Sequence, residues 1–184
     1  MRESNRIQEV RPPIVPVVER MISATPGTIS MAQGMVAFAP PHQAIDALTT
    51  FHDDPASYRY GPVEGLPSLI EALEEKLINE NGIHVRPNSQ LIVTAGSNMA
   101  FVYALLAIAD FGDEIILVTP FYFNHEMAVV MAGCRSVPVA VDEHCQLQLN
   151  LIRAALTPRT RAVVTISPNN PTGVVYSQTV LSEV

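Results

Sequence analysis

The chain has 184 residues and a formal net charge of −7; 48% of its residues are hydrophobic and only 6% are aromatic. This length can bury a sizeable core, and the absence of tryptophan together with few aromatics indicates an aliphatic α/β interior. The negative charge argues against nucleic acid and anionic membranes as partners, because both attract basic surfaces.

Signals that direct a chain out of the cytoplasm are absent from this sequence. The first residues, MRESNR, carry both charge signs and lead into no apolar run, so we expect no secretory signal. The longest apolar run, residues 101–109, is too short to span a bilayer. Two cysteines, Cys134 and Cys145, do not make a disulfide framework, and we expect a cytoplasmic location. His144 precedes Cys145, but this pair lacks a spaced second pair, so no metal site is predicted.

Residues 1–43 are punctuated by prolines, and we interpret them as an N-terminal arm with a segment of a small domain. Apolar residues on one side of residues 13–24 predict a short helix that Gly27 ends. An extended piece around Ile29–Ala32 and a turn at Gln33–Gly34 are expected to follow.

Residues 44–184 have the pattern of a different domain. Helices are predicted over residues 44–51 and 66–81, the second amphipathic and ended by Gly82. Short β-rich runs then alternate with helical ones, which predicts a mainly parallel sheet with helices on both faces. The predicted strands are 90–94, 114–119, 136–141 and 162–166, and the helices between them are 98–110, 123–132 and 149–156.

The last predicted helix starts after Ser177, a good N-cap, and has no C-cap before Val184. A helix that stops after about two turns predicts that the chain has been cut from a longer protein.

Three loops follow strands at the carboxyl edge of the predicted sheet, where ligands bind in open α/β folds. The segment TAGSN (residues 94–98) turns a strand into a helix whose first N–H groups suit a phosphate. TPFYFNH (119–125) places an aromatic side chain that can stack on a planar ring. SPNNPTG (167–173) is a rigid loop that can direct the Asn170 amide into a site, with a cis bond expected at Asn170–Pro171. Ordinary turns and aromatic packing remain the alternatives for each loop taken alone.

Taken in order, these loops resemble the class I/II aminotransferases of pyridoxal 5'-phosphate (PLP) fold type I, from about residue 12 to the last residue. The resemblance implies a three-layer α/β/α large domain, here incomplete, with an N-terminal arm and small-domain segment. SMAQG (30–34) and FAPP (38–41) resemble the family's substrate loop, which gives Gly34 a place beside the substrate carboxylate. YGPVEGLPSL (60–69) resembles the Y-G-x-x-x-G-x-x-x-L segment, whose tyrosine, here Tyr60, reaches the cofactor phosphate in the neighbouring subunit of a homodimer.

The same resemblance assigns the cofactor-binding residues. Gly96, Ser97 and Asn98 match the phosphate cup. Tyr122 matches the aromatic residue stacked on the pyridine ring, and Asn170 matches the asparagine that hydrogen-bonds the ring's phenolic oxygen. The implied cofactor is PLP.

The departures from the family pattern matter as much as the matches. The only lysine, Lys76, lies on an acidic helical surface where its amine should be solvated and protonated, so the Schiff-base lysine is absent and no catalytic residue is assigned. The family's aspartate for the pyridine nitrogen, its later tyrosine and its arginines are absent too. In the family the strand order is 3-2-4-5-6-7-1. Strands 5, 6 and 7 are absent here, so strand 1 (residues 90–94) would be separated from strand 4 by the gap that they leave. The phosphate cup is then expected to be detached from Tyr122 and Asn170.

We therefore expect the N-terminal half of a PLP-dependent aminotransferase, which moves an amino group between an amino acid and a 2-oxo acid in a homodimeric parent. A non-catalytic truncated remnant, or a lyase or synthase of the same fold, is the alternative. An effector sensor fused to a winged-helix DNA-binding domain is disfavoured, because no basic helix-turn-helix precedes the arm. The substrate amino acid is not predicted.

Overall fold

The computed structural model describes residues 2–31, 34 and 36–184. It divides into two compact units: residues 1–26 together with 95–184, here called the sheet unit, and residues 27–94, here called the helical unit. The predicted boundary between residues 43 and 44 concerns the family's domains and stays a prediction. Of the predicted turn at Gln33–Gly34, Gln33 lies outside the described residues, as do Ala32 and Met35.

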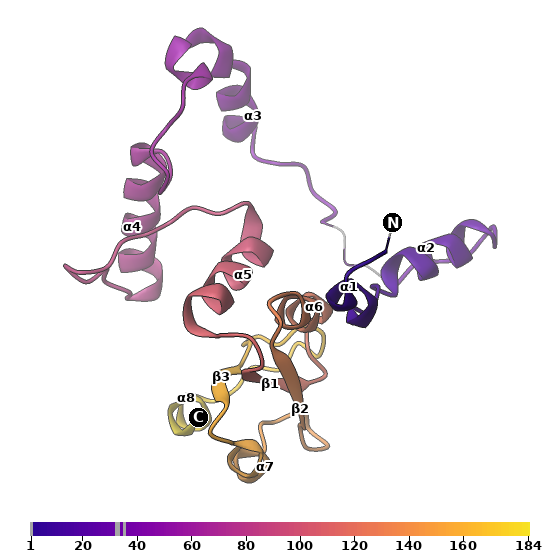
Figure 1. The fold of residues 1–184 in the computed structure, drawn as a ribbon. Coiled ribbons are helices and arrows are strands. Elements are labelled where there is room, and N and C mark those ends of the chain that lie inside the picture. Colours follow the sequence, from indigo (N-terminus) through magenta and orange to yellow (C-terminus); the bar gives the residue numbers. More distant parts are fainter. Residues whose placement is uncertain (1, 32–33, 35) are drawn as a thin grey trace. The chain divides into compact units, whose positions relative to one another are not determined.

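A parallel three-stranded sheet is the centre of the sheet unit (Figure 1). Strand β1 (Glu114–Thr119) lies between β2 (Arg135–Ala140) and β3 (Thr160–Val164). Parallel neighbours need crossover connections, which α6 (Phe123–Met131) and α7 (Leu149–Ala155) supply. These strands and helices confirm the predicted ones within two residues. The order β2-β1-β3 also matches the expected family order of strands 3-2-4.

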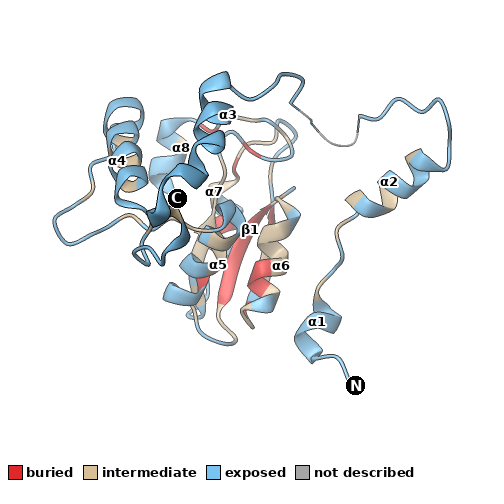
Figure 2. Ribbon diagram, turned by 90° about the horizontal axis from the view of Figure 1, so that it is seen from above, coloured by how far each residue is buried: buried red, intermediate tan, exposed pale blue. Residues whose placement is uncertain are grey.

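Alternating side chains of β1 fill two cores, one on each face of the sheet. Ile115 and Leu117 pack with α6 and with α5 (Gly96–Ile108), whereas Ile116 and Val118 pack on the other face with α7. The C-terminal α8 (Gln178–Glu183) joins the second core through Val180. Because both faces are covered, β1 is buried nearly throughout (Figure 2). The three-layer α/β/α arrangement is confirmed.

The arm of the sheet unit contains two helices, α1 (Asn5–Glu9) and α2 (Val15–Ser23). The sequence did not predict α1, a single turn capped by the Ser4 hydroxyl, which accepts a hydrogen bond from the Ile7 amide at 3.4 Å. The Arg6 guanidinium donates to the Met131 carbonyl at 3.3 Å, so α1 is held at the end of α6.

The helical unit contains α3 (His42–Thr49), the 3₁₀ turns η1 (Phe51–Asp53) and η2 (Pro55–Tyr58), and α4 (Pro67–Asn81). Helix α4 ends as predicted at Gly82, whose φ of 63° is in the left-handed region where a residue without Cβ is unstrained.

The predicted strand over residues 90–94 is wrong. These residues, all of them described, belong to no strand. A β-strand needs a ladder partner, and the sheet consists of β1, β2 and β3 alone. Instead, the Val93 amide donates to the Glu64 carbonyl at 2.7 Å, which fastens the segment to the loop before α4.

Within the described part of the chain, no helix is long and apolar enough to cross a membrane. Nor do the described His, Cys, Asp and Glu side chains form a group of three or more that could hold a metal ion.

Candidate cofactor site

The candidate site is built at one edge of the sheet unit. Parallel strands end at the same edge, so the loops after β1 and β3 leave the sheet side by side. The first loop carries Tyr122 at the start of α6, and the second carries Asn170. Both residues were predicted from the sequence to hold a cofactor.

The loop after β3 is folded around Asn169, which is only 8% exposed. Its backbone amide donates to the Val174 carbonyl at 2.8 Å, and its carbonyl accepts from the Gly173 amide at 2.7 Å. Its side-chain Nδ2 donates to Thr172 Oγ1 at 2.9 Å and to the Pro120 carbonyl at 3.3 Å. The last bond ties this loop to the loop after β1.

Asn170, by contrast, is exposed, so its amide is available to a ligand. The Asn170–Pro171 peptide bond is cis, which confirms the expectation from the sequence. Gly173 closes the loop with a φ of 74°, a backbone conformation that L side chains rarely adopt.

Tyr122 is half-buried and held from two sides. The Asn124 Nδ2 donates to its hydroxyl at 2.6 Å. Its ring meets the His125 ring edge-on, with centroids 5.5 Å apart and an interplanar angle of 87°. Asn124 thus holds the hydroxyl end of the Tyr122 side chain, and an aromatic ring fixed at its tip suits a residue that stacks on a planar group.

His125 lies between Tyr122 and α5. Its ring stacks on Phe101 with centroids 3.9 Å apart, and burial lowers its pKa below the ordinary value. Its Nδ1 is buried and meets no hydrogen-bond partner among the described residues. This contact packs α5 directly on α6. The expectation that the phosphate cup itself is detached from Tyr122 and Asn170 stays a prediction. Helix packing through Phe101, which the strand order alone could not show, holds α5 in place.

The first turn of α5 can hold an anion. Gly96 has a φ of 80°, and a Cβ added there meets nothing within 4 Å, so open space lies before the helix. Ala95 at the N-cap supplies no side-chain cap, and no acidic residue occupies the first turn. Ser97 and Asn98 are exposed beside Gly96. A helix start with these features attracts negative charge through its N–H groups and dipole.

Tyr60 and Gly34 belong to the helical unit, and both are exposed. Tyr60 leads into a tight turn in which Gly65 has a φ of 130°, and a Cβ on Gly65 would lie 2.7 Å from Val93 Cγ2. The second glycine of the YGPVEG segment is therefore required by the close approach of residues 90–94.

Lys76 is placed as the sequence predicted. Its Nζ lies 2.6 Å from Glu80 Oε2 on an exposed face of α4, so the amine is held in a solvated ion pair. Such an amine is a poor nucleophile.

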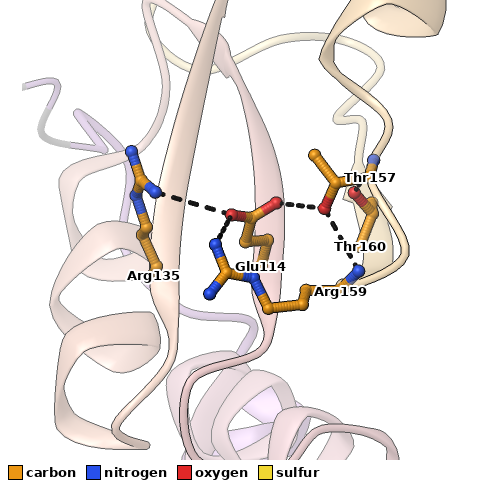
Figure 3. Close-up of polar contacts among 5 residues, drawn as sticks. All are labelled: Glu114, Arg135, Thr157, Arg159 and Thr160. Atoms are coloured by element: carbon orange, nitrogen blue, oxygen red, sulfur yellow. Dashed lines mark hydrogen bonds and ion pairs between the residues drawn. The ribbon is translucent and has the colours of Figure 1, made fainter.

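Sequence reasoning missed a buried carboxylate at the opposite edge of the sheet (Figure 3). Glu114, 3% exposed, begins β1, accepts from Thr157 Oγ1 at 2.6 Å and pairs with Arg159 at 3.1 Å and Arg135 at 3.5 Å. The Thr157 hydrogen bond and the two guanidinium groups lower the pKa of Glu114, against the opposing effect of burial. This cluster lies at the amino-terminal end of β1, away from the candidate site, and it stabilises the sheet.

Comparison with known proteins identifies the family. Residues 26–184 match the family model described as aminotransferase class I and II. An aromatic aminotransferase of Arabidopsis thaliana is 32% identical over 94% of this chain and 44% of its own length. An aspartate aminotransferase of Pyrococcus abyssi is 33% identical over 100% of this chain and 48% of its own length. The chain thus spans about half the length of these relatives.

The fold comparison agrees. A solved aspartate aminotransferase of Thermus thermophilus, a single mutant, superposes with a TM-score of 0.87 at 34% identity. The match covers 100% of this chain and 49% of that structure. By sequence and by fold, the chain belongs to the family of class I and II aminotransferases.

Proposed function

We propose that this chain is the cofactor-binding N-terminal part of a PLP-dependent aminotransferase, which transfers an amino group between an amino acid and a 2-oxo acid. The observation that carries the proposal is the start of α5, where Ala95 supplies no side-chain cap and no acidic residue occupies the first turn, joined through Phe101 and His125 to the Tyr122 loop. PLP, when bound, supplies the electron sink for amino-group transfer. An aminotransferase is favoured over a lyase because the relatives named above are aminotransferases.

Residues of the sheet unit bind different parts of the cofactor. Gly96, Ser97 and Asn98 bind the phosphate through the helix start and two polar side chains. Tyr122 stacks on the pyridine ring, and the Asn170 amide donates to the phenolic oxygen. Binding and orientation are thereby provided within one unit.

The family resemblance gives two residues of the helical unit proposed roles of their own. Gly34 approaches the substrate carboxylate through its backbone, and Tyr60 reaches a cofactor phosphate in the second subunit of a homodimer. The relatives' names give aromatic and aspartate specificity in different cases, so the proposed substrate class remains amino acids and 2-oxo acids.

Proton transfer and covalent attachment are not provided by these 184 residues. The one lysine is paired with Glu80 on an exposed helix, and His125 is half-buried between two aromatic rings. We therefore expect the chain by itself to bind the cofactor without catalysing amino-group transfer.

Binding of pyridoxamine 5'-phosphate tests the proposal, because this form of the cofactor cannot react with stray amines. We expect saturable binding to the 184-residue chain, followed by ligand fluorescence, and about tenfold or weaker binding of pyridoxamine, which lacks the phosphate. Asn98→Asp, which places a carboxylate in the cup, should weaken only the phosphorylated ligand. Asp46→Asn on α3 is the matched control with the opposite charge change. Equal affinity for the two ligands would contradict the proposed phosphate cup.

A further inference from the structure

Asn169 stands out because it is buried yet polar. Only Glu114 and Asn169 are charged or strongly polar among the buried described residues, and Glu114 already has its partners at the other edge of the sheet. Asn169 immediately precedes Asn170, to which the resemblance gives the cofactor contact. The family resemblance gave Asn169 no role.

The side chain of Asn169 uses both of its N–H groups. One reaches Thr172 Oγ1 in its own loop, at 2.9 Å, and the other reaches the Pro120 carbonyl at 3.3 Å, 49 residues away in sequence. Pro120 is two residues before Tyr122. An amide is the smallest neutral side chain with two donors on one nitrogen, so aspartate, serine or alanine cannot make both bonds.

The two bonds have different consequences. The bond to Thr172, together with the backbone bonds to Gly173 and Val174, shapes the loop that presents Asn170. The bond to Pro120 fixes that loop against the segment that presents Tyr122. Because Asn169 is buried, loss of either acceptor leaves a buried N–H group of its side chain without that partner, which costs free energy.

We propose that Asn169 is a positioning residue that sets Asn170 and Tyr122 relative to one another, and so fixes the two contacts made to the cofactor ring. The inference rests on the proposed function. Asn169 itself touches neither cofactor nor substrate and acts through its neighbours.

The first test needs no ligand and uses amide hydrogen exchange of the 184-residue chain. Asn169→Asp and Asn169→Ala should speed exchange about tenfold in two segments, residues 121–125 and 169–175. Asn170→Ala should change neither segment to that extent. Unchanged exchange in residues 121–125 of both Asn169 variants would overturn the inference, because Asn169 would then shape only its own loop.

A second pair of variants keeps the test decisive if the Asn169 variants do not fold. Thr172→Val removes the hydroxyl that accepts from Asn169 Nδ2 and from the Val174 amide, whereas Thr172→Ser keeps it. We expect Thr172→Val to speed exchange in residues 169–175 and to weaken ligand binding, and Thr172→Ser to restore both. Failure of the serine variant to restore them would count against a hydrogen-bonded role.

Ligand affinity is the measurement that would stay unchanged if Asn169 had a purely structural role. We expect Asn169→Ala to weaken pyridoxamine 5'-phosphate binding about tenfold, and Tyr122→Ala to weaken it about two- to tenfold. Because Asn169 acts partly through Tyr122, the double variant should lose less affinity than the product of the two losses. Strictly multiplicative losses would refute positioning. Absence of binding to the unaltered chain would instead contradict the proposed function. The amide hydrogen exchange of residues 121–125 and 169–175 would still decide the role of Asn169.

Discussion

Glu114 and Arg159 lie 45 residues apart in the sequence and are joined twice in the fold. The Arg159 Nη2 donates to Glu114 Oε1 at 3.1 Å, and the Glu114 amide donates to the Arg159 carbonyl at 2.9 Å. The register of β1 against β3 shifts between Glu114 and Ile115, so these two bonds hold the strands where the regular ladder begins. The buried carboxylate and its partners (Figure 3) thus fix the start of the sheet, and the candidate site lies at the other end.

Glu114→Gln should therefore make the chain less stable at neutral pH and less sensitive to acid. The pKa of Glu114 is lowered in the fold, first by the Thr157 hydrogen bond and then by the arginines. Its stabilising effect is present above the ordinary glutamate pKa, about 4.3, and is lost as the pH falls through the lower pKa of the folded chain. Urea unfolding at a series of pH values measures the unfolding free energy of the variant and of the unaltered chain, and so compares their pH dependence.

Glu183→Gln is the matched control. Glu183 also pairs with an arginine, Arg153, at 3.7 Å, but both side chains are more than half exposed. Exposed pairs contribute little, so this variant should unfold like the unaltered chain at every pH. If the two glutamate variants gave the same acid profile, the buried cluster would not be the source of the effect.

His125 should give a pH dependence in a different range. Burial lowers its pKa, so between the two pKa values the unfolded chain binds more protons than the folded chain. The stability linked to His125 is then present above the ordinary histidine pKa, about 6.5, and is lost as the pH falls through the lower folded value.

His125→Phe keeps a ring against Phe101 and removes the titrating nitrogens. We expect this variant to flatten the change in unfolding free energy between about pH 7 and pH 5. His144→Gln, at a side chain that is 79% exposed, should leave the slope in place. If the unfolding free energy of His125→Phe changed with pH as it does in the unaltered chain, His125 would not be the source of this pH dependence.

Leu117→Ala tests the central strand by creating a cavity. Leu117 is 1% exposed and packs between β1 and the helices α5 and α6, so its truncation should cost about 2–5 kcal/mol. Leu106→Ala on the outer face of α5, where the side chain is 60% exposed, should stay within about 0.5 kcal/mol of the unaltered chain. Equal losses in urea unfolding would mean that the first core is not formed around β1.

The local pattern of the sequence was enough to predict β1, β2, β3 and their helices. Runs of aliphatic residues bounded by Gly112 and Gly133, and alternating with helical segments, have few other interpretations. Residues 90–94 have the same local character, yet they form no strand, because a strand depends on neighbours that a local pattern does not reveal.

The candidate site was predictable only in part, for a similar reason. Asn170 and Tyr122 stand in recognisable motifs, whereas the partners that hold them come from elsewhere in the chain. The stack of His125 on Phe101 joins two helices, and the Asn169 bond to Pro120 spans two loops. A second asparagine beside Asn170 was a visible signal, but its burial could not be read from sequence.

Gly65→Ala should destabilise the helical unit by about 1–3 kcal/mol. The φ of 130° strains any L side chain, and the new Cβ would lie 2.7 Å from Val93 Cγ2 and 3.1 Å from Val93 Cβ. Gly82→Ala has a φ of 63° and open space within 4 Å, so it carries the backbone strain alone and should cost less. Unfolding followed by far-UV circular dichroism compares them, and an equal loss would contradict a close approach at Val93.

Tyr122 offers the most direct test of ring stacking at the candidate site. Tyr122→Phe keeps the ring and loses only the hydroxyl that accepts from Asn124, so we expect pyridoxamine 5'-phosphate affinity within about twofold of the unaltered chain. Tyr122→Ala removes the ring, and a lost stacking contact of about 0.5–1.5 kcal/mol corresponds to a loss of about two- to tenfold.

Phe123→Ala is the matched control for that loss, because the neighbouring ring also meets Tyr122, with centroids 5.1 Å apart, but is itself exposed. We expect this variant to bind like the unaltered chain in the same fluorescence titration. If Tyr122→Ala bound equally well while Phe123→Ala did not, the stacking residue would be Phe123.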